Sequence, residues 1–221
     1  MRRLNRLLFL AAVFLFLATS DRGLAAATIG NTTIVVRTVT GVLSTEKRHL
    51  QFKDDIYSNE IIETFNESAT EITFLDQTTL SLGPNTNVTL DRFIYDPNPA
   101  NSAFVLTVAE GALRFASGVL PSESYKIHTP VATIGIRGTV VDIVVEQETE
   151  ADGTIQTKVN LTVVEGEADL FNCDGVLTLV PEGLSSSVTG SLEGCSQGSE
   201  PGLQPEEVTA ILRSRDELLG R

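Results

Sequence analysis

The sequence contains no tryptophan, one methionine, two cysteines and two histidines, and only 6% of its residues are aromatic. Two Cys and two His are too few for a zinc or iron–sulfur site built from several such ligands. Few aromatic rings also leave few surfaces on which bases or sugars could stack. Basic residues are scarce as well, with 16 Lys and Arg against 29 Asp and Glu and a formal net charge of −13. Because affinity for nucleic acid comes from Lys and Arg patches, we expect no nucleic-acid partner.

Motifs that carry enzyme chemistry are missing too. His49 and His128 are isolated, without the spacing that holds a metal ion. There is no P-loop or GxGxxG fingerprint, and no pair of acidic residues is singled out as catalytic. We therefore expect neither an enzyme nor a bound cofactor or metal.

The first 27 residues have the pattern of a signal peptide. Three arginines, Arg2, Arg3 and Arg6, precede an apolar run from Leu7 to Ala18 that is too short to span a bilayer as a helix. Small residues at positions 25–27 suit cleavage before Thr28. We expect a periplasmic or secreted protein with no stable membrane insertion after cleavage, the alternative being an uncleaved anchor.

From Thr28 to about residue 188 the chain alternates polar and apolar side chains, as in Glu71-Ile72-Thr73-Phe74 and Lys158-Val159-Asn160-Leu161. This period of two is typical of strands with one buried face. Turn residues such as Asp152-Gly153 recur along it, and no long window has helical spacing. At 42% hydrophobic and 20% charged residues, the composition is that of a folded globule. The prediction is one all-β domain of short strands, with a solenoid-like or sandwich build, over residues 28–195.

The two cysteines, Cys173 and Cys195, lie within this predicted domain. In an oxidising compartment an even number of cysteines favours a disulfide. A redox pair is the alternative, although the CxxC spacing that lowers a thiol pKa is missing. The favoured interpretation is a structural bridge around residues 174–194.

Two segments resemble each other around a Glu-Gly dipeptide, at Glu110-Gly111 and at Glu165-Gly166, and Glu182-Gly183 is a fainter third copy. We expect a strand to enter each corner and a second strand to leave it, with glycine supplying a positive φ. Either the chain has a structural repeat or Glu-Gly is simply a common turn dipeptide.

Beyond Cys195 the composition changes. Residues 196–204 read as a flexible linker, and residues 205–221 as a short amphipathic helix that begins near Pro205. Its apolar face comprises Val208, Ile211, Leu212 and Leu219. A helix of this length is marginal alone. It docks either on an open edge of its own β domain or on a partner.

The most distinctive stretch runs from Ile127 to Ile143. Its elements are Thr129, Pro130, Ala132, Gly135, Arg137, Gly138 and Thr139, followed by an alternating strand. This pattern closely resembles the signature of the FecR domain family, named after a regulator of iron-dicitrate transport in bacteria. The segment 69–90 is similar to the family's strand-turn-strand, except that Gln77 replaces the glycine of an Asp-Gly-Thr turn. The resemblance covers about residues 41–150.

Within the motif, Pro130 suits the start or edge of a strand, and Gly135 and Gly138 predict a bend or bulge around Arg137. Two roles are open for Arg137. Its guanidinium either binds a partner or ties backbone carbonyls or a carboxylate across the corner.

The resemblance implies a periplasmic, non-catalytic β domain. In iron-transport regulators such a domain lies between a cytoplasmic segment that binds a sigma factor and a segment that senses an outer-membrane receptor. Only Met1 to Arg6 precede the apolar run here, so we expect no relay to a cytoplasmic sigma factor by this chain. The function expected is that of a protein-interaction module in the bacterial envelope, acting in signalling with an envelope protein as partner. A glycan- or ligand-binding module of the envelope is the alternative.

Overall fold

A computed structural model of the chain describes residues 26–191, 194–196, 217 and 220. Fifteen strands between Thr28 and Ser196 join into one hydrogen-bonded sheet, which confirms the all-β prediction. The strands of the first half are β1 (Thr28–Val36), β2 (Val39–Leu43), β3 (Glu46–His49), β4 (Asp55–Tyr57), β5 (Glu60–Thr64), β6 (Ala69–Phe74), β7 (Thr79–Leu82) and β8 (Asn87–Ile94). Those of the second half are β9 (Ala103–Ala116), β10 (Tyr125–His128), β11 (Ala132–Thr149), β12 (Ile155–Asn172), β13 (Leu177–Pro181), β14 (Ser185–Ser191) and β15 (Gly194–Ser196).

Two 3₁₀ turns, η1 (Pro99–Asn101) and η2 (Ser122–Ser124), lie on either side of β9 in the sequence. The predicted helix at 205–221 lies outside the described residues, apart from the isolated positions 217 and 220. Within the described part of the chain, no helix is long and apolar enough to cross a membrane.

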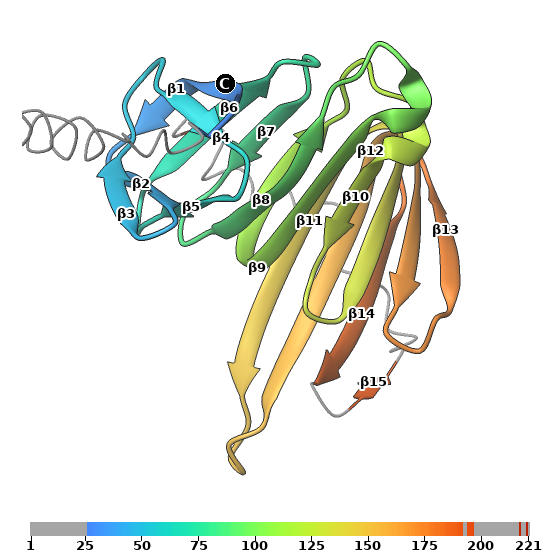
Figure 1. Cartoon of the computed structure of the whole chain (residues 1–221). Coiled ribbons are helices and arrows are strands. Elements are labelled where there is room, and N and C mark those ends of the chain that lie inside the picture. The colour runs from blue at the N-terminus through green and yellow to red at the C-terminus, as the bar shows by residue number, and fades with distance from the viewer. Residues whose placement is uncertain (1–25, 192–193, 197–216, 218–219, 221) are drawn as a thin grey trace, which may run out of the picture.

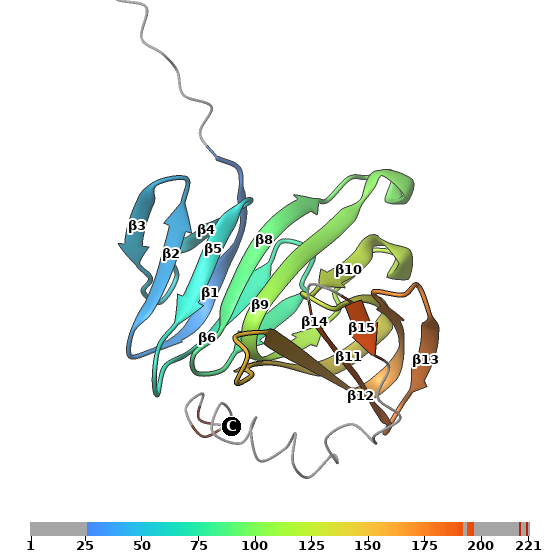
Figure 2. The ribbon, with the colours of Figure 1, turned by 90° about the horizontal axis from the view of Figure 1, so that it is seen from below.

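The sheet is open and bends around its core, as Figures 1 and 2 show. Its main path runs β15-β14-β12-β11-β10-β9-β7-β6-β1-β4, while β8, β5, β2 and β3 branch from β9 and β13 lies beside β12. Among the described strands, β9 and β10 form the one parallel pair, in which the first residue of β10, Tyr125, lies beside Phe104 near the start of β9. Residues 117–124, which include η2, connect the two strands. The β11–β12 hairpin projects from the rest of the molecule (Figure 1).

The prediction that all strands are short is wrong for three of them. β9 has 14 residues, and β11 and β12 have 18 each. The expectation that separate strands enter and leave Glu110-Gly111 and Glu165-Gly166 is also wrong, because both dipeptides lie inside continuous strands. Each strand bends there and changes neighbours: β9 pairs with β8 up to Glu110 and with β11 from Gly111 onward. Glu182-Gly183 does separate two strands, β13 and β14.

The core is a single cluster of buried apolar side chains contributed by both halves of the sheet. At its centre Phe104 of β9 lies 4.8 Å from Phe74, 5.4 Å from Phe115 and 5.8 Å from Tyr125, measured between ring centroids. These rings come from β6, β9 and β10, so the aromatic residues join strands that are distant in sequence. The contacts of Phe104 with Phe74 and Phe115 are edge-to-face, an arrangement that adds to the stability gained from burial.

Candidate interaction face

The Thr129–Ala132 segment is the turn between β10 and β11. The backbone N–H of Thr129 donates to the carbonyl of Ala132 at 2.8 Å, and the Thr129 hydroxyl accepts from the N–H of Ala132 at 3.0 Å. Pro130 is exposed at the tip, and Val131 is buried. This part of the motif therefore closes the hairpin and fixes the register of β11.

Gly138 and Gly166 form a second structural unit where β11 and β12 bend together. Both have positive φ, 63° and 82°, and a Cβ on Gly166 would lie 2.6 Å from the carbonyl oxygen of Gly138. The Thr139 hydroxyl donates to the carbonyl of Glu165, and its N–H donates to the Ser117 hydroxyl at 2.9 Å. The register of the two strands shifts at this bulge, between Arg137 and Val140.

The repeat dipeptide at Glu110-Gly111 is packed as tightly. Gly111 has a φ of 106°, and a Cβ there would lie 2.4 Å from Thr86 Cα. The Thr86 hydroxyl accepts from the N–H of Ala112 at 3.1 Å. Glycine is thus required at this bend by conformation and by space.

Arg137 pairs with Asp169 on the neighbouring strand β12. Its Nε and Nη2 lie 2.8 and 2.6 Å from Asp169 Oδ2, and 54% of the Arg137 side chain is exposed. The guanidinium therefore binds a carboxylate across the strand pair and also remains open to solvent. Asp169 Oδ1 is buried with no hydrogen-bond partner among the described groups.

Two rows of residues cross the strands β8 to β13 on one side of the sheet. The first row contains Arg92, Val105, Lys126, Gly135, Asp169 and Leu179. The second contains Thr107, His128, Thr133, Phe171 and Leu177. Between the rows, Leu106, Ile127 and Ile134 are fully buried, so the rows form the outward side of these strands. We call these two rows the outer face.

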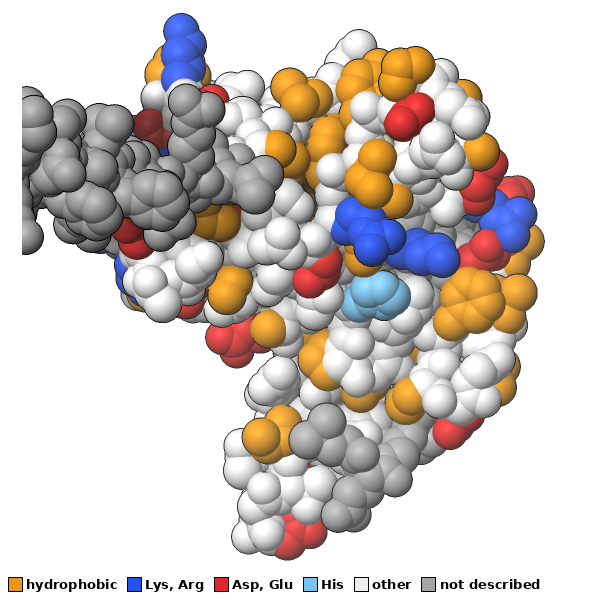
Figure 3. All heavy atoms as spheres, in the orientation of Figure 1, with side chains coloured by type: hydrophobic (Ala, Val, Ile, Leu, Met, Phe, Trp, Pro, Cys, Tyr) orange, Lys and Arg blue, Asp and Glu red, His pale blue; other side chains and the backbone are white. Residues whose placement is uncertain are grey.

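A groove of about 620 Å³ lies beside η2, over the part of the outer face that β10, β11 and β12 form. It is lined by Glu123 of η2, Lys126, Gly135, Arg137, Asp169 and Phe171, among others. Basic side chains gather beside a histidine over the middle strands of this half of the molecule, and apolar side chains lie next to them (Figure 3). The motif residues Gly135 and Arg137 thus lie in the groove, while Thr129, Pro130 and Ala132 form the hairpin turn at the end of β10.

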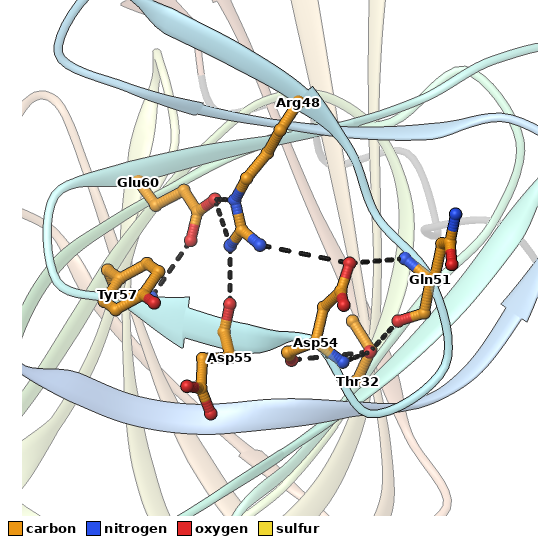
Figure 4. Close-up of polar contacts among 7 residues, drawn as sticks. All are labelled: Thr32, Arg48, Gln51, Asp54, Asp55, Tyr57 and Glu60. Atoms are coloured by element: carbon orange, nitrogen blue, oxygen red, sulfur yellow. Dashed lines mark hydrogen bonds and ion pairs between the residues drawn. The ribbon is translucent and has the colours of Figure 1, made fainter.

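A polar cluster that the sequence patterns did not reveal lies in the N-terminal half (Figure 4). Glu60 is fully buried and accepts from Arg48 Nη2 at 2.7 Å and from the backbone N–H of Tyr57 at 2.9 Å. Gly41 makes room for it, since a Cβ there would lie 2.1 Å from Glu60 Oε1. The carboxylate is surrounded by donors from this chain, so the cluster serves to join β2, β3, β4 and β5. The sequence Glu60-Ile61-Ile62-Glu63 does not indicate which of its two acidic side chains is buried.

A second buried carboxylate, Asp76, holds the turn after β6 to the segment before β10. It accepts from the hydroxyls of Thr78 at 2.7 Å and Tyr125 at 2.9 Å. The Tyr125 oxygen in turn accepts from the N–H of Leu120 at 3.0 Å. Burial, together with the nearby Asp76 carboxylate, raises the pKa of Tyr125 to about 12.

The remaining predicted residues lie at or beyond the limit of the described chain. Cys173 follows the end of β12 and Cys195 lies in β15, but the side chain of Cys195 is outside the described part, so the disulfide stays a prediction. The same holds for the predicted apolar helix face at 208, 211, 212 and 219. Over residues 26–191, no three His, Cys, Asp or Glu side chains come together as a metal site.

Comparison with known proteins gives one family match. The family model described as FecR protein matches residues 60–169, a segment that runs from β5 into β12 and includes the Thr129–Thr139 motif. No curated protein matches the chain.

Two crystal structures of a candidate anti-sigma factor from Parabacteroides distasonis are similar to 69% of this chain, each with 15% sequence identity and a TM-score of 0.49. The match covers 64% and 63% of those two chains, so this chain spans just under two thirds of their length.

Proposed function

Because this chain carries a FecR domain in residues 60–169, we propose that it is an exported, non-catalytic protein-interaction module that acts in signalling in the bacterial cell envelope. FecR domains belong to a regulatory family rather than an enzymatic one. The N-terminal arginines, the apolar run and the small residues before Thr28 support export.

The observation that carries the proposal is the composition of the outer face. The side chains of Arg92 and Lys126 are exposed and make no ion pair within the part of the chain that the structure describes, and neither do those of Lys53 and Lys158. Further along the same rows, on β12 and β13, Phe171, Leu177 and Leu179 are 38%, 52% and 51% exposed. Exposed apolar side chains beside charged ones on a rigid sheet are typical of protein-binding surfaces.

Site-specific photo-crosslinking in living cells tests this proposal. A photo-reactive amino acid replaces Glu123 at the groove, and in a matched control it replaces Asp152, which is exposed at the tip of the β11–β12 hairpin. We expect a discrete crosslinked protein in the envelope fraction from position 123 and none from position 152. A protein retained in the cytoplasm, or no crosslink that differs between the two positions, would contradict the proposal. A crosslink to glycan would favour the ligand-binding alternative.

A further inference from the structure

Strand β13 is an open edge of the sheet. It pairs with β12 on one side and has no neighbour on the other side among the described strands. The turn that leads into β13 fixes which of its backbone groups face β12, because the N–H of Asn172 donates to the carbonyl of Val176 at 3.0 Å. Bonded residues alternate along an antiparallel ladder, so Thr178 bonds to β12, and its neighbours Leu177 and Leu179 turn their N–H and C=O groups away from it.

The outward backbone groups of Leu177 and Leu179 are available for pairing with a further strand. These four groups have no hydrogen-bond partner within the part of the chain that the structure describes. The two leucine side chains lie on the outer face and are exposed, and Phe171 lies beside Leu177 in register. A strand added at this edge would therefore gain main-chain hydrogen bonds and apolar contacts together.

The other edges of the sheet, among the described strands, are protected against such pairing. β3 consists of Glu46–His49, with a charged or titratable side chain at each position. β4 and β15 have only three residues each, and β4 begins with Asp55. Charge and short length are common means by which proteins keep an edge from pairing. β13, in contrast, has five uncharged residues, and only Pro181 limits pairing at its end.

The surroundings of β13 are acidic. The sequence has no Lys or Arg at positions 159–212. Asp174 before β13, Glu182 directly after it and Glu167 on β12 are exposed, and none of them makes an ion pair within the described residues. β11 supplies one base, Arg137, which is already paired with another carboxylate of β12. A strand that pairs with β13 therefore meets negative charge at both of its ends.

A second copy of this chain fits the edge poorly. The antiparallel register that uses all four outward groups of both copies places Leu177 of one copy opposite Leu179 of the other. That register brings Asp174 of each copy toward Glu182 of the other, and like charges that face each other are destabilising. The formal net charge of −13 adds to the repulsion between copies. The chemistry of the edge therefore favours a different protein as partner.

We propose that β13 binds an extended segment of a partner protein as an additional strand of the sheet. The segment carries apolar side chains at alternate positions, which pack on Leu177 and Leu179, and a Lys or Arg next to them. Main-chain hydrogen bonds supply affinity, while the apolar side chains and the attraction of the basic residue to Asp174 or Glu182 select the sequence. This inference rests on the proposed function, because it names the edge at which the partner docks and the chemistry of the docking segment.

A displayed library of short random peptides, selected on the immobilised full-length protein, tests the proposal. We expect enrichment of sequences with alternating apolar residues and at least one Lys or Arg. Binding of the selected peptides is then measured by fluorescence anisotropy. Leu179→Pro removes an outward N–H without breaking a bond to β12, and it is expected to weaken binding by about tenfold or more. Leu179→Ile, the matched control, keeps the N–H and an apolar side chain and should bind as the parent protein does.

The charge at the two ends of β13 is tested separately. Asp174→Ser/Glu182→Gln is expected to weaken binding of the basic peptides and to reduce its dependence on salt. Glu146→Gln/Glu148→Gln is the matched control, because it removes the same charge from exposed positions on β11. Thermal unfolding should show that these variants are folded. The two charge variants keep the proposal open to test even if Leu179→Pro does not fold.

Failure to enrich peptides with alternating apolar residues, or equal affinity of the peptides for Leu179→Pro and Leu179→Ile, would overturn the proposal. Equal affinity for the two charge variants would contradict its basic residue. A dimer of the parent protein in analytical ultracentrifugation that Leu179→Pro abolishes would assign the edge to a second copy instead. Crosslinking from position 123 separates these results from failure of the proposed function: a crosslink that persists in Leu179→Pro leaves the interaction module intact and rejects only β13 as its docking edge.

Discussion

Arg114 on β9 and Asp142 on β11 face each other in register, with Nε and Nη2 of the arginine each 2.6 Å from one carboxylate oxygen. The Asp142 side chain is almost fully buried, whereas a third of Arg114 is exposed. This pair joins two long strands that lie far apart in the sequence.

Asp142→Asn should lower the free energy of unfolding by about 2 kcal/mol, because it weakens charged hydrogen bonds at a buried position. Urea unfolding of the single and double variants measures the effect. The double variant Arg114→Met/Asp142→Leu should lose less free energy of unfolding than Arg114→Met and Asp142→Leu lose in total. If the losses of the two single variants add up to that of the double variant, the two side chains do not stabilise the fold through their interaction.

Gln77 occupies the turn between β6 and β7 with a φ of 69°, the left-handed region that glycine adopts without strain. Gln77→Gly should therefore raise the free energy of unfolding by about 1 kcal/mol. Gln77→Ala retains the Cβ and should change stability little. Equal stability of the Gly and Ala variants, measured by thermal unfolding, would mean that this turn stores no strain.

Gly111 and Gly183 both have positive φ, but only Gly111 is crowded, by Thr86; nothing lies within 4 Å of a Cβ on Gly183. Gly183→Ala should cost about 1 kcal/mol from backbone strain alone. Gly111→Ala should cost at least twice as much, because Thr86 must also move. If urea unfolding gives the two variants the same stability, the bend in β9 tolerates displacement and the tight contact is unimportant.

Alternation along the sequence was enough to predict the sheet because most strands have one buried side. Phe104, Leu106 and Val108 are buried as their spacing indicates, and so are Val141 and Ile143. Alternation does not identify which strands become neighbours. β9 pairs with β7, β8, β10 and β11, and its bend at Gly111 lets one strand serve two sets of partners.

The groove could not be predicted for the same reason. Arg92, Lys126 and Gly135 lie in one row only because of the registers of β8, β9, β10 and β11. The motif did single out Gly135 and Arg137, but it predicted a bend or bulge around Arg137 and not a groove. The backbone bends at Gly138, whereas Gly135 lies in regular strand.

The predicted bridge between Cys173 and Cys195 would close a loop that contains β13 and β14. Cys173→Ser/Cys195→Ser should lower the free energy of unfolding by about 3 kcal/mol under oxidising conditions. Reductant should remove the difference between the variant and the parent protein. Thiol titration of the unfolded parent protein provides the check, since reaction of both cysteines without reductant would refute the bridge.

Tyr125 links stability to alkaline pH. Its pKa in the fold, about 12, lies above the value of about 10 for an unfolded tyrosine, so the fold favours the neutral phenol. The stability that this hydroxyl contributes is complete below about pH 10 and is lost as the pH rises toward 12. Tyr125→Phe should lower stability at neutral pH, because the hydroxyl no longer donates to Asp76 or accepts from Leu120.

The same variant should also flatten the decline in stability between about pH 10 and pH 12, because no phenol remains at that position to ionise. Urea midpoints measured across this range give the slope, and difference absorbance between parent and variant follows the phenolate of Tyr125 directly. Tyr95→Phe is the matched control, since Tyr95 is 55% exposed. It should leave the alkaline decline due to Tyr125 in place. Parallel pH profiles for the parent protein and Tyr125→Phe would show that the buried hydroxyl does not govern alkaline unfolding.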